Sequence, residues 1–213
     1  MEAQKNKNSL PTLRIYFWDR PSITAGYFQD LLKIARRYRV KEKRIPLVRR
    51  PTGGGLVLHN KDLTFSLTLK NPNPYLPKDI KASYQAVNEA LYEGLHRDYA
   101  LQYVPSNIIP SGRGLDARAC FEKPTCFDLL WKGKKAVGAS QRRKDGAILH
   151  QSAVFLAGSR EKMTMDIVRG FEKRWKICFF KKGLTRAELA KAILIEKARY
   201  QDSSWQVSAK NER

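Results

Sequence analysis

The stretch Arg49-Arg50-Pro51-Thr52-Gly53-Gly54-Gly55-Leu56-Val57-Leu58-His59 decides how the rest of the sequence is interpreted. Strand signals at 45–48 and 56–59 flank it, so the three glycines are predicted to lie in a turn between two strands. Glycines there expose backbone N–H groups and remove every Cβ, which lets a ligand lie against the chain. The two arginines suit a carboxylate or a phosphate, which a guanidinium can grip as a fork. A hairpin turn with a basic flank remains the alternative, because Gly-Gly turns are common.

Working outward, the hydrophobic pattern predicts strands before and after this stretch and helices toward both ends. Apolar runs and alternating apolar and polar residues predict strands at 13–18, 24–28, 63–69, 101–104, 126–131, 135–140 and 147–156. Helical spacing predicts helices at 30–39, 79–97, 162–175 and 185–201, the last opening with a Thr185–Glu188 capping box. The apolar face of the helix 79–97 is predicted to carry Ile80, Tyr84, Val87, Leu91 and Leu95. The predicted fold class is therefore α+β, with mixed or antiparallel sheets flanked by helices.

Two further segments carry residues suited to chemistry. In the segment 134–143, Lys135 leads into small residues and could place an ammonium beside a substrate; an exposed basic hairpin is the alternative. Cys120 stands in a Gly- and Pro-rich loop of a strongly positive protein, where nearby cations favour the nucleophilic thiolate. The alternative is that this lone cysteine is an inert small hydrophobe.

Composition and charge narrow the class of protein. The chain has 213 residues, 42% of them hydrophobic and 29% charged, which is typical of a folded domain. Its formal net charge of +21 favours binding to polyanions or acidic proteins. No apolar stretch reaches the roughly 20 residues of a membrane span, and the polar start does not predict a signal peptide. The three cysteines, Cys120, Cys126 and Cys178, form no metal-binding pattern, so we expect a reduced cytoplasmic protein.

Four segments in order resemble the lipoate-protein ligase and octanoyltransferase superfamily, which is related in fold to the biotin-protein ligases. VRRPTGGGLVLHNKDLTFSL (48–67) is similar to its Arg-Arg-x-[Ser/Thr]-Gly-Gly-Gly loop, and GKKAVGASQRR (133–143) to its Lys-(Ile/Val)-x-Gly-Ser-Ala element. LRIYFWDRPSITAGYFQ (13–29) resembles the strand pair before the loop, and RYQDSSWQ (199–206) the closing helix. ACFEKPTCFDLL (119–130) resembles the Cys-Phe-x-x-Pro-[Ser/Thr] segment of the cysteine-dependent octanoyltransferases and lipoyl amidotransferases.

The resemblance implies a role for each matched residue. Cys120 would be the nucleophile, and Lys135 would contact the acyl carbonyl and favour the thiolate. The remaining matched positions would bind substrate: Arg49, Arg50, Thr52, Gly53, Gly54, Gly55, His59, Gly138, Ala139 and Ser140.

The implied reaction moves an octanoyl or lipoyl group from acyl carrier protein or a lipoylated donor onto Cys120. A lysine of an acidic lipoyl domain, or of the glycine-cleavage H protein, then takes the acyl group as an amide, so no cofactor is required. The net charge of +21 would attract both acidic partners. The alternative is an ATP-dependent lipoate-protein ligase, which needs ATP and Mg. An inactive paralogue or a basic nucleic-acid-binding protein comes third, and no helix-turn-helix or RNA-binding signature supports nucleic acid as a partner.

The sequence also departs from the family pattern. Only Met1-Glu2-Ala3 resembles the end of the usual N-terminal strand and helix, so we expect part of that unit to be missing. His150-Gln151-Ser152 stands where relatives carry His-Gly-[Ser/Thr], with the histidine displaced by one position and hence turned to the opposite face of its strand. Asn60 replaces the usual aspartate, and a member of altered specificity is therefore an alternative. The expected organisation is a loose segment 1–12, a catalytic domain 13–206 and a polar tail 207–213.

Overall fold

The computed structural model describes residues 10–104 and 128–201 of the chain. Its strands are β1 Thr12–Phe17, β2 Ser22–Ala25, β3 Leu47–Arg49, β4 Val57–His59, β5 Leu63–Lys70, β6 Gln102–Tyr103, β7 Leu129–Trp131, β8 Lys134–Lys135, β9 Val137–Lys144 and β10 Ala147–Val154. Its helices are α1 Leu31–Arg37, α2 Ile80–Leu95, α3 Arg160–Trp175 and α4 Arg186–Ile195, with a π-helical turn η2 Glu196–Tyr200 continuing α4. The predicted α+β class is confirmed.

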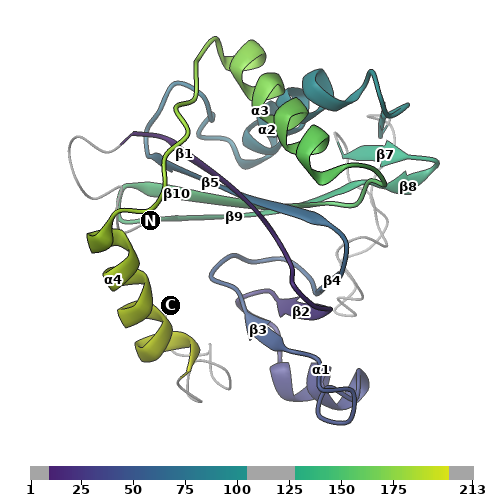
Figure 1. The fold of residues 1–213 in the computed structure, drawn as a ribbon, viewed down its shortest axis with the longest axis vertical. Coiled ribbons are helices and arrows are strands. Elements are labelled where there is room, and N and C mark those ends of the chain that lie inside the picture. The colour runs from purple at the N-terminus through teal and green to yellow at the C-terminus, as the bar shows by residue number, and fades with distance from the viewer. Residues whose placement is uncertain (1–9, 105–127, 202–213) are drawn as a thin grey trace.

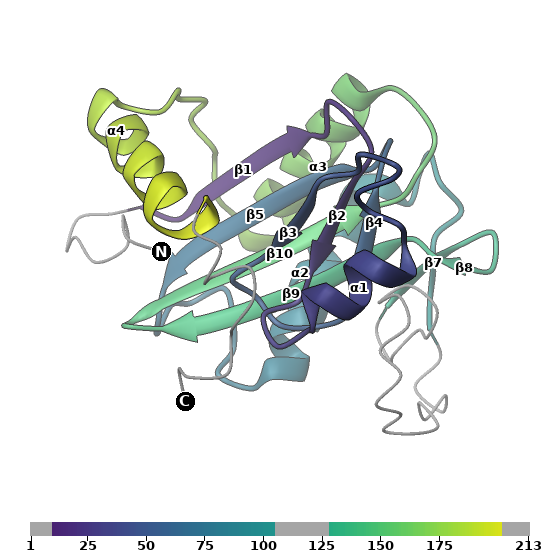
Figure 2. The same cartoon turned by 90° about the horizontal axis from the view of Figure 1, so that it is seen from below.

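The elements form layers around one antiparallel sheet. That sheet has the order β1-β5-β10-β9, and α2 and α3 cover one of its faces (Figure 1). The small sheet β3-β2-β4 lies on the other side, with β2 parallel to β3 and antiparallel to β4 (Figure 2). The described sheets are thus mixed and antiparallel, as predicted. A third small sheet, β6-β7-β8, lies near the end of α3 (Figure 1) and pairs antiparallel throughout.

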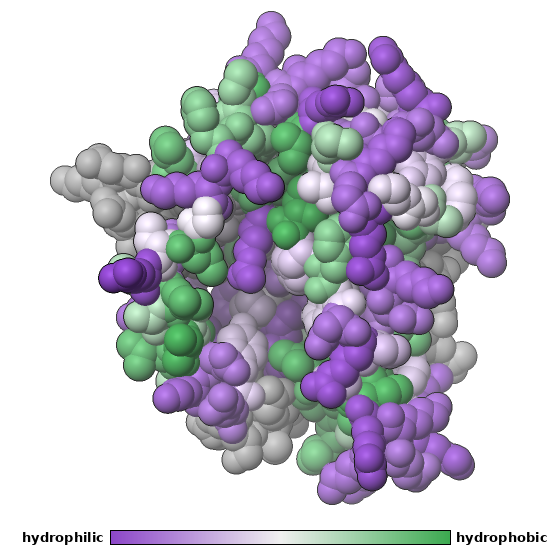
Figure 3. All heavy atoms as spheres, viewed as in Figure 1, coloured by the Kyte–Doolittle hydropathy of each residue, from purple (hydrophilic) through white to green (hydrophobic). Residues whose placement is uncertain are grey.

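Helix α4 stands apart from these layers. It has no buried residue, and apolar side chains stand out along it in the space-filling view (Figure 3). The predicted capping box is present, because Thr185 Oγ1 accepts from the Glu188 N–H while the Glu188 carboxylate accepts from the Thr185 N–H. The cap therefore begins this helix without help from burial.

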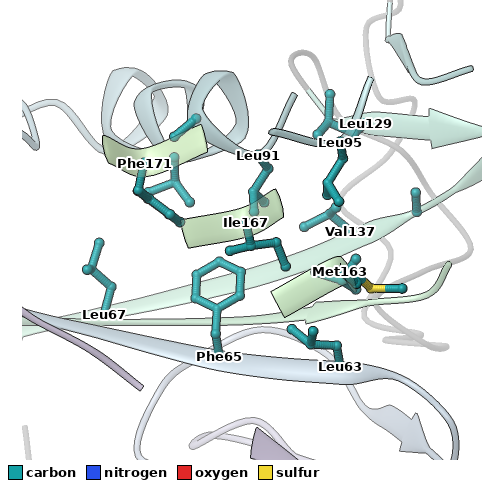
Figure 4. Packing of buried hydrophobic residues seen from close by; sticks show 14 of the residues in the cluster. Leu63, Phe65, Leu67, Leu91, Leu95, Leu129, Val137, Met163, Ile167 and Phe171 are labelled. Carbon is teal, nitrogen blue, oxygen red and sulfur yellow. The ribbon is translucent and has the colours of Figure 1, made fainter. Parts of the chain in front are cut away.

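The alternating pattern of β5 divides the main sheet into two chemically different faces. Leu63, Phe65, Leu67 and Leu69 are at most 2% exposed and point toward the helices. There they meet residues of α2 and α3 such as Leu91, Leu95, Met163, Ile167 and Phe171 (Figure 4). Burying each such side chain stabilises the fold by about 1.5–3 kcal/mol. Thr64, Ser66 and Thr68 alternate with these residues and so lie on the other face of the sheet.

Two glycines bring the backbones of α2 and α3 into contact. A Cβ on Gly94 would stand 2.0 Å from the carbonyl oxygen of Asp166, and one on Gly170 would stand 2.2 Å from that of Ala90. Real Cβ atoms essentially never come closer than 3.0 Å to another atom, so the helices cross at a distance that only glycine permits.

Several predicted boundaries were wrong by a few residues. The predicted strand 24–28 is β2 at 22–25, because the chain turns at Gly26, whose N–H donates to the Gln29 carboxamide. The predicted strand 135–140 is divided between β8 and β9. Ile80, predicted on the apolar face of α2, is 59% exposed because it lies in the first turn of the helix, and Asp79 caps that turn. The predicted limits of the domain remain predictions.

Candidate active site

A cavity of about 170 Å³ lies between the main sheet and the small sheet. A hollow is visible between α4 and the small sheet (Figure 3). The walls combine aromatic and small apolar groups with a few polar ones: Tyr16, Trp18, Thr24, Val48, Arg50, Pro51, Val57, His59, Thr64, Gly138, Ala139, Ser140, Gln151, Ser152, Ala153 and Tyr200. A largely apolar cavity with a few polar groups is suited to a ligand that has an apolar body and a polar head.

Arg50 holds the glycine loop in place at the cavity. Its Nη2 donates to the carbonyl oxygens of Gly53 and Gly55, both at 2.6 Å, and the guanidinium also lies 3.3 Å from the Thr24 carbonyl. Gly54 has a φ of +84°, which explains glycine at that position. A Cβ on Gly53 would meet nothing within 4 Å, so the loop is open on that side. Gly54 is therefore required by its backbone conformation, whereas Gly53 leaves open space beside the loop.

Arg49 points elsewhere. Its side chain is 1% exposed, and its guanidinium donates to the carbonyl oxygens of Tyr27 and Gln29. Burial lowers the pKa of Arg49. Arg49 is not among the lining residues of the cavity. The structure thus brings only one of the two predicted arginines to the cavity, and Arg49 holds the turn before α1.

A chain of hydroxyl and amide groups joins Thr52 to two side chains that the main sheet contributes to the cavity wall. Ser140 Oγ donates to Thr52 Oγ1 at 2.8 Å, and Thr52 Oγ1 donates to the Gln151 carboxamide oxygen at 2.8 Å. Gln151 also hydrogen-bonds to Tyr16, whose pKa is raised because burial outweighs that bond. Ser140 and Gln151 are paired neighbours on β9 and β10, which places both side chains on the cavity face. Thr52 and Ser140 are thus in contact, although only Ser140 lines the cavity, and their predicted role in substrate binding remains a prediction.

His59 lies in a buried hydrogen-bonded chain at the cavity. Its Nε2 is 2.8 Å from Thr24 Oγ1, and its Nδ1 is 2.8 Å from Asp62 Oδ2. The Trp18 ring stacks on the imidazole with 4.1 Å between centroids and 23° between planes. Burial alone would raise the pKa of Asp62, but hydrogen bonds from His59, Asn60 and Thr64 hold that pKa below its ordinary value. The carboxylate therefore stays charged beside the imidazole.

Lys135 and Cys120 are the two predicted catalytic residues, and the cavity as described includes neither. Lys135 pairs with Asp128, Nζ to Oδ2 at 2.7 Å, and is not among the lining residues. Cys120, with Cys126, lies outside the described residues, so the predicted nucleophile remains a prediction.

His150 lies behind the cavity wall, on the helix side of β10. It is fully buried, and burial lowers its pKa to about 3. Gln141 Nε2 donates to its Nδ1 at 2.9 Å, so the proton of the neutral ring is on Nε2, which donates to Ser152 Oγ at 2.7 Å. Gln151, the next residue, points into the cavity instead. His150 is therefore part of the buried core and not of the cavity wall.

Sequence reasoning missed eleven of the residues that line the cavity: Tyr16, Trp18, Thr24, Val48, Pro51, Val57, Thr64, Gln151, Ser152, Ala153 and Tyr200. Asp62, three residues after His59, was the one partner that local spacing could have suggested. Over residues 10–104 and 128–201, no group of three or more His, Cys, Asp or Glu side chains could hold a metal ion. Nor is any helix in these ranges long and apolar enough to cross a membrane.

Known proteins match this chain in sequence and in fold. The sequence profile of the lipoyl protein ligase A/B catalytic domain matches residues 1–186. Octanoyltransferase LipM of Halalkalibacterium halodurans is 28% identical over 242 residues, covering 92% of this chain and 86% of that protein. Octanoyltransferase LipM of Moorella thermoacetica is 36% identical over 146 residues, covering 68% of this chain. This chain spans about half the length of that protein (54%) and of the Bacillus cereus LipM (56%).

Solved structures show the same fold. Lipoate-protein ligase A bound with ATP superposes with a TM-score of 0.74 at 23% identity, covering 93% of this chain and 86% of that one. A bi-partite lipoate protein ligase from Thermoplasma acidophilum gives a TM-score of 0.73 at 22% identity, covering 97% and 87%. At these identities the likeness extends to the fold alone.

Proposed function

Because this chain belongs to the family of the lipoyl protein ligase A/B catalytic domain, we propose that it transfers an octanoyl or lipoyl group to a lysine of a lipoyl-accepting domain. The observation that carries the proposal is the cavity between the two sheets, taken with relatives named octanoyltransferase at up to 36% identity. The acyl chain would lie among Trp18, Val57 and Ala153, with its carbonyl near the loop that Arg50 holds.

The lining of the cavity favours an acyl chain over a nucleotide. Trp18, Val57 and Ala153 give it apolar walls, which suit an alkyl chain. Two donor contacts of Arg50 go to the carbonyls of its own loop, which favours a positioning role over a phosphate grip. We therefore favour transfer from a thioester, without ATP or Mg, over ATP-dependent ligation.

The covalent step would use Cys120. Its thiolate attacks the thioester of octanoyl-acyl carrier protein, forming a new thioester and releasing the carrier thiol. A lysine amine then displaces the cysteine, and the resulting amide is lower in energy than a thioester. Lys135, now paired with Asp128, would polarise the carbonyl in this scheme.

Acidic partners fit the charge of the chain. A net charge of +21 would attract an acidic carrier protein, an acidic lipoyl domain or the glycine-cleavage H protein, and would raise their association rates. We place the reaction in the cytoplasm, where such carriers would encounter the enzyme and where its cysteines would stay reduced.

Intact-mass spectrometry tests the proposal. The protein is mixed with octanoyl-acyl carrier protein in the absence of ATP, beside a Cys120→Ser control. We expect an octanoyl adduct on the natural chain and none on the control. If no adduct forms, but an added lipoyl domain gains the octanoyl group only with ATP and free octanoate, the ligase route holds instead. A folded protein that transfers from neither donor would contradict both.

A further inference from the structure

We propose that Thr24, His59 and Asp62 form a proton relay that deprotonates the lysine amine acceptor. The inference rests on the proposed function and adds an acid–base device to it. Thr24 would touch the acceptor amine, His59 would take the proton, and Asp62 would act as a positioning residue. Thr24 Oγ1, the His59 ring and Asp62 Oδ2 form an unbroken chain with both links at 2.8 Å.

The surroundings of Asp62 fix which nitrogen of His59 carries its proton. Asp62 Oδ1 accepts from the Asn60 N–H at 2.9 Å, and Oδ2 accepts from Thr64 Oγ1 at 2.9 Å as well as from the imidazole. An ionised carboxylate can only accept, so His59 Nδ1 must carry hydrogen. In the neutral ring this leaves Nε2 as an acceptor that faces Thr24. The tautomer is therefore the one a base needs.

The ring is also held in orientation. Trp18 stacks on the imidazole, and its indole N–H donates to Thr64 Oγ1 at 2.8 Å, the same hydroxyl that donates to Asp62. The Asp62 side chain is fully buried and that of His59 is 4% exposed. A purely structural link between His59 and Asp62 would need only one hydrogen bond. Here both ring nitrogens of His59 and both carboxylate oxygens of Asp62 have a hydrogen-bond partner, which fixes the orientation of both side chains.

Arg50 makes the same position unfavourable for an ammonium. Its Nη1 lies 3.4 Å from Thr24 Oγ1, so a cationic lysine approaching Thr24 meets a guanidinium. A cation near the amine favours its neutral form, which is the form that attacks a thioester. Thr24 and His59 both line the cavity, so the acceptor can reach the hydroxyl from the ligand side.

The proton balance of the step is simple. The lysine ammonium gives a proton to Thr24 Oγ1 as that hydroxyl passes its own proton to His59 Nε2, leaving an imidazolium beside the Asp62 carboxylate. The neutral amine attacks the acyl carbonyl, the C–N bond forms and the C–S bond breaks. The second amine proton goes to the departing thiolate, and the imidazolium releases its proton to solvent.

The test compares two acceptors that differ in their need for a base. The variants are Thr24→Val, which keeps the shape but removes the hydroxyl, Thr24→Ser, which keeps the hydroxyl, and Asp62→Asn. A lipoyl domain supplies a lysine that is protonated at neutral pH, whereas hydroxylamine is neutral there and needs no base. Transfer of the octanoyl group is followed by mass, and urea unfolding midpoints establish that each variant folds.

We expect Thr24→Val and Asp62→Asn to lower kcat for the lipoyl domain by about 10²-fold or more, with a small change in KM. Transfer to hydroxylamine should stay within a few-fold of the natural chain, and Thr24→Ser should retain lysine transfer. Equal losses with both acceptors, or no loss with the lipoyl domain, would overturn the relay.

The donor separates this proposal from the proposed function. If the natural chain transfers only from ATP and free octanoate, the thioester route is wrong. The relay is then tested with that donor, by comparing the loss of transfer to the lipoyl domain with the loss of transfer to hydroxylamine. If the natural chain transfers from neither donor, both proposals are wrong.

Discussion

Replacing Gly26 by alanine should displace the glycine loop and thereby impair both stability and activity. A Cβ on Gly26 would stand 1.9 Å from the carbonyl oxygen of Gly54, whereas real Cβ atoms essentially never come closer than 3.0 Å to another atom. The oxygen must therefore retreat by at least about 1.1 Å, on the difference between these two distances. The loop cannot move freely, because Arg50 holds the carbonyls on both sides of Gly54.

The magnitude follows from this geometry. Overpacking of this kind costs about 1–3 kcal/mol of unfolding free energy, which corresponds to a fall of about 1 M in the urea midpoint for a small domain. A displacement of about 1 Å at a reacting centre can cost about 10²-fold in rate. We expect Gly26→Ala to show both losses, measured by tryptophan fluorescence in urea and by initial rates of octanoyl transfer.

Two glycines of the same chain supply controls. A Cβ on Gly53 or on Gly183 would meet nothing within 4 Å, and neither residue has a positive φ. Gly53→Ala and Gly183→Ala should therefore unfold at or slightly above the urea concentration of the natural chain, because alanine lowers the entropy of the unfolded state. Gly183→Ala should also keep the natural rate. A Gly26→Ala protein with an unchanged midpoint and rate would refute the close approach of the two loops.

Three other changes test the packing of the described residues. The pKa of His150 in the folded chain, about 3, lies below its ordinary value of 6.5, so protonation of His150 favours the unfolded chain. The free energy of unfolding should therefore fall by up to about 1.4 kcal/mol per pH unit as the pH drops from 6.5 toward 3. In urea titrations at several pH values, His150→Gln should reduce this pH dependence. Gly170→Ala, which would place a Cβ 2.2 Å from the Ala90 carbonyl, should lower the unfolding free energy by about 1–3 kcal/mol in thermal melts, and an unchanged melt would contradict the helix contact. Asp128→Asn leaves the Lys135 ammonium, 6% exposed, without its carboxylate and should cost about 3–5 kcal/mol, whereas the double replacement Asp128→Leu with Lys135→Met should recover most of that loss.

The order of apolar and polar residues along the chain predicted those strands and helices in which buried and exposed residues alternate regularly. The alternation of β5 placed Phe65 and Leu67 in the core, and the capping box at Thr185 placed the start of α4. These features depend on residues close together in the chain, so a sequence displays them directly. The prediction that Ile80 would be buried was wrong, because helical spacing does not show whether other elements cover the first turn of a helix.

The site was predicted less completely, because its contacts join distant segments. His59 was expected to bind substrate, but its bond to Thr24 spans 35 residues and gives no local signal. Arg49 and Arg50 look equivalent in the sequence, yet Arg49 is the last residue of β3 and Arg50 already lies outside the strand. Only Arg50 lines the cavity, while Arg49 bonds to the backbone carbonyls of Tyr27 and Gln29.

The two-faced main sheet should separate the effects of mutation by residue parity. Along β5, odd-numbered positions such as Phe65 and Leu67 face the helices, whereas Thr64 faces the cavity. Along β10 the parity is reversed, because His150 lies on the helix side and Gln151 in the cavity. In a saturation mutagenesis screen, abundance and catalysis should therefore alternate along each strand with a period of two. The two alternations should be out of phase between β5 and β10, which gives a genetic readout of the strand register without any further structure.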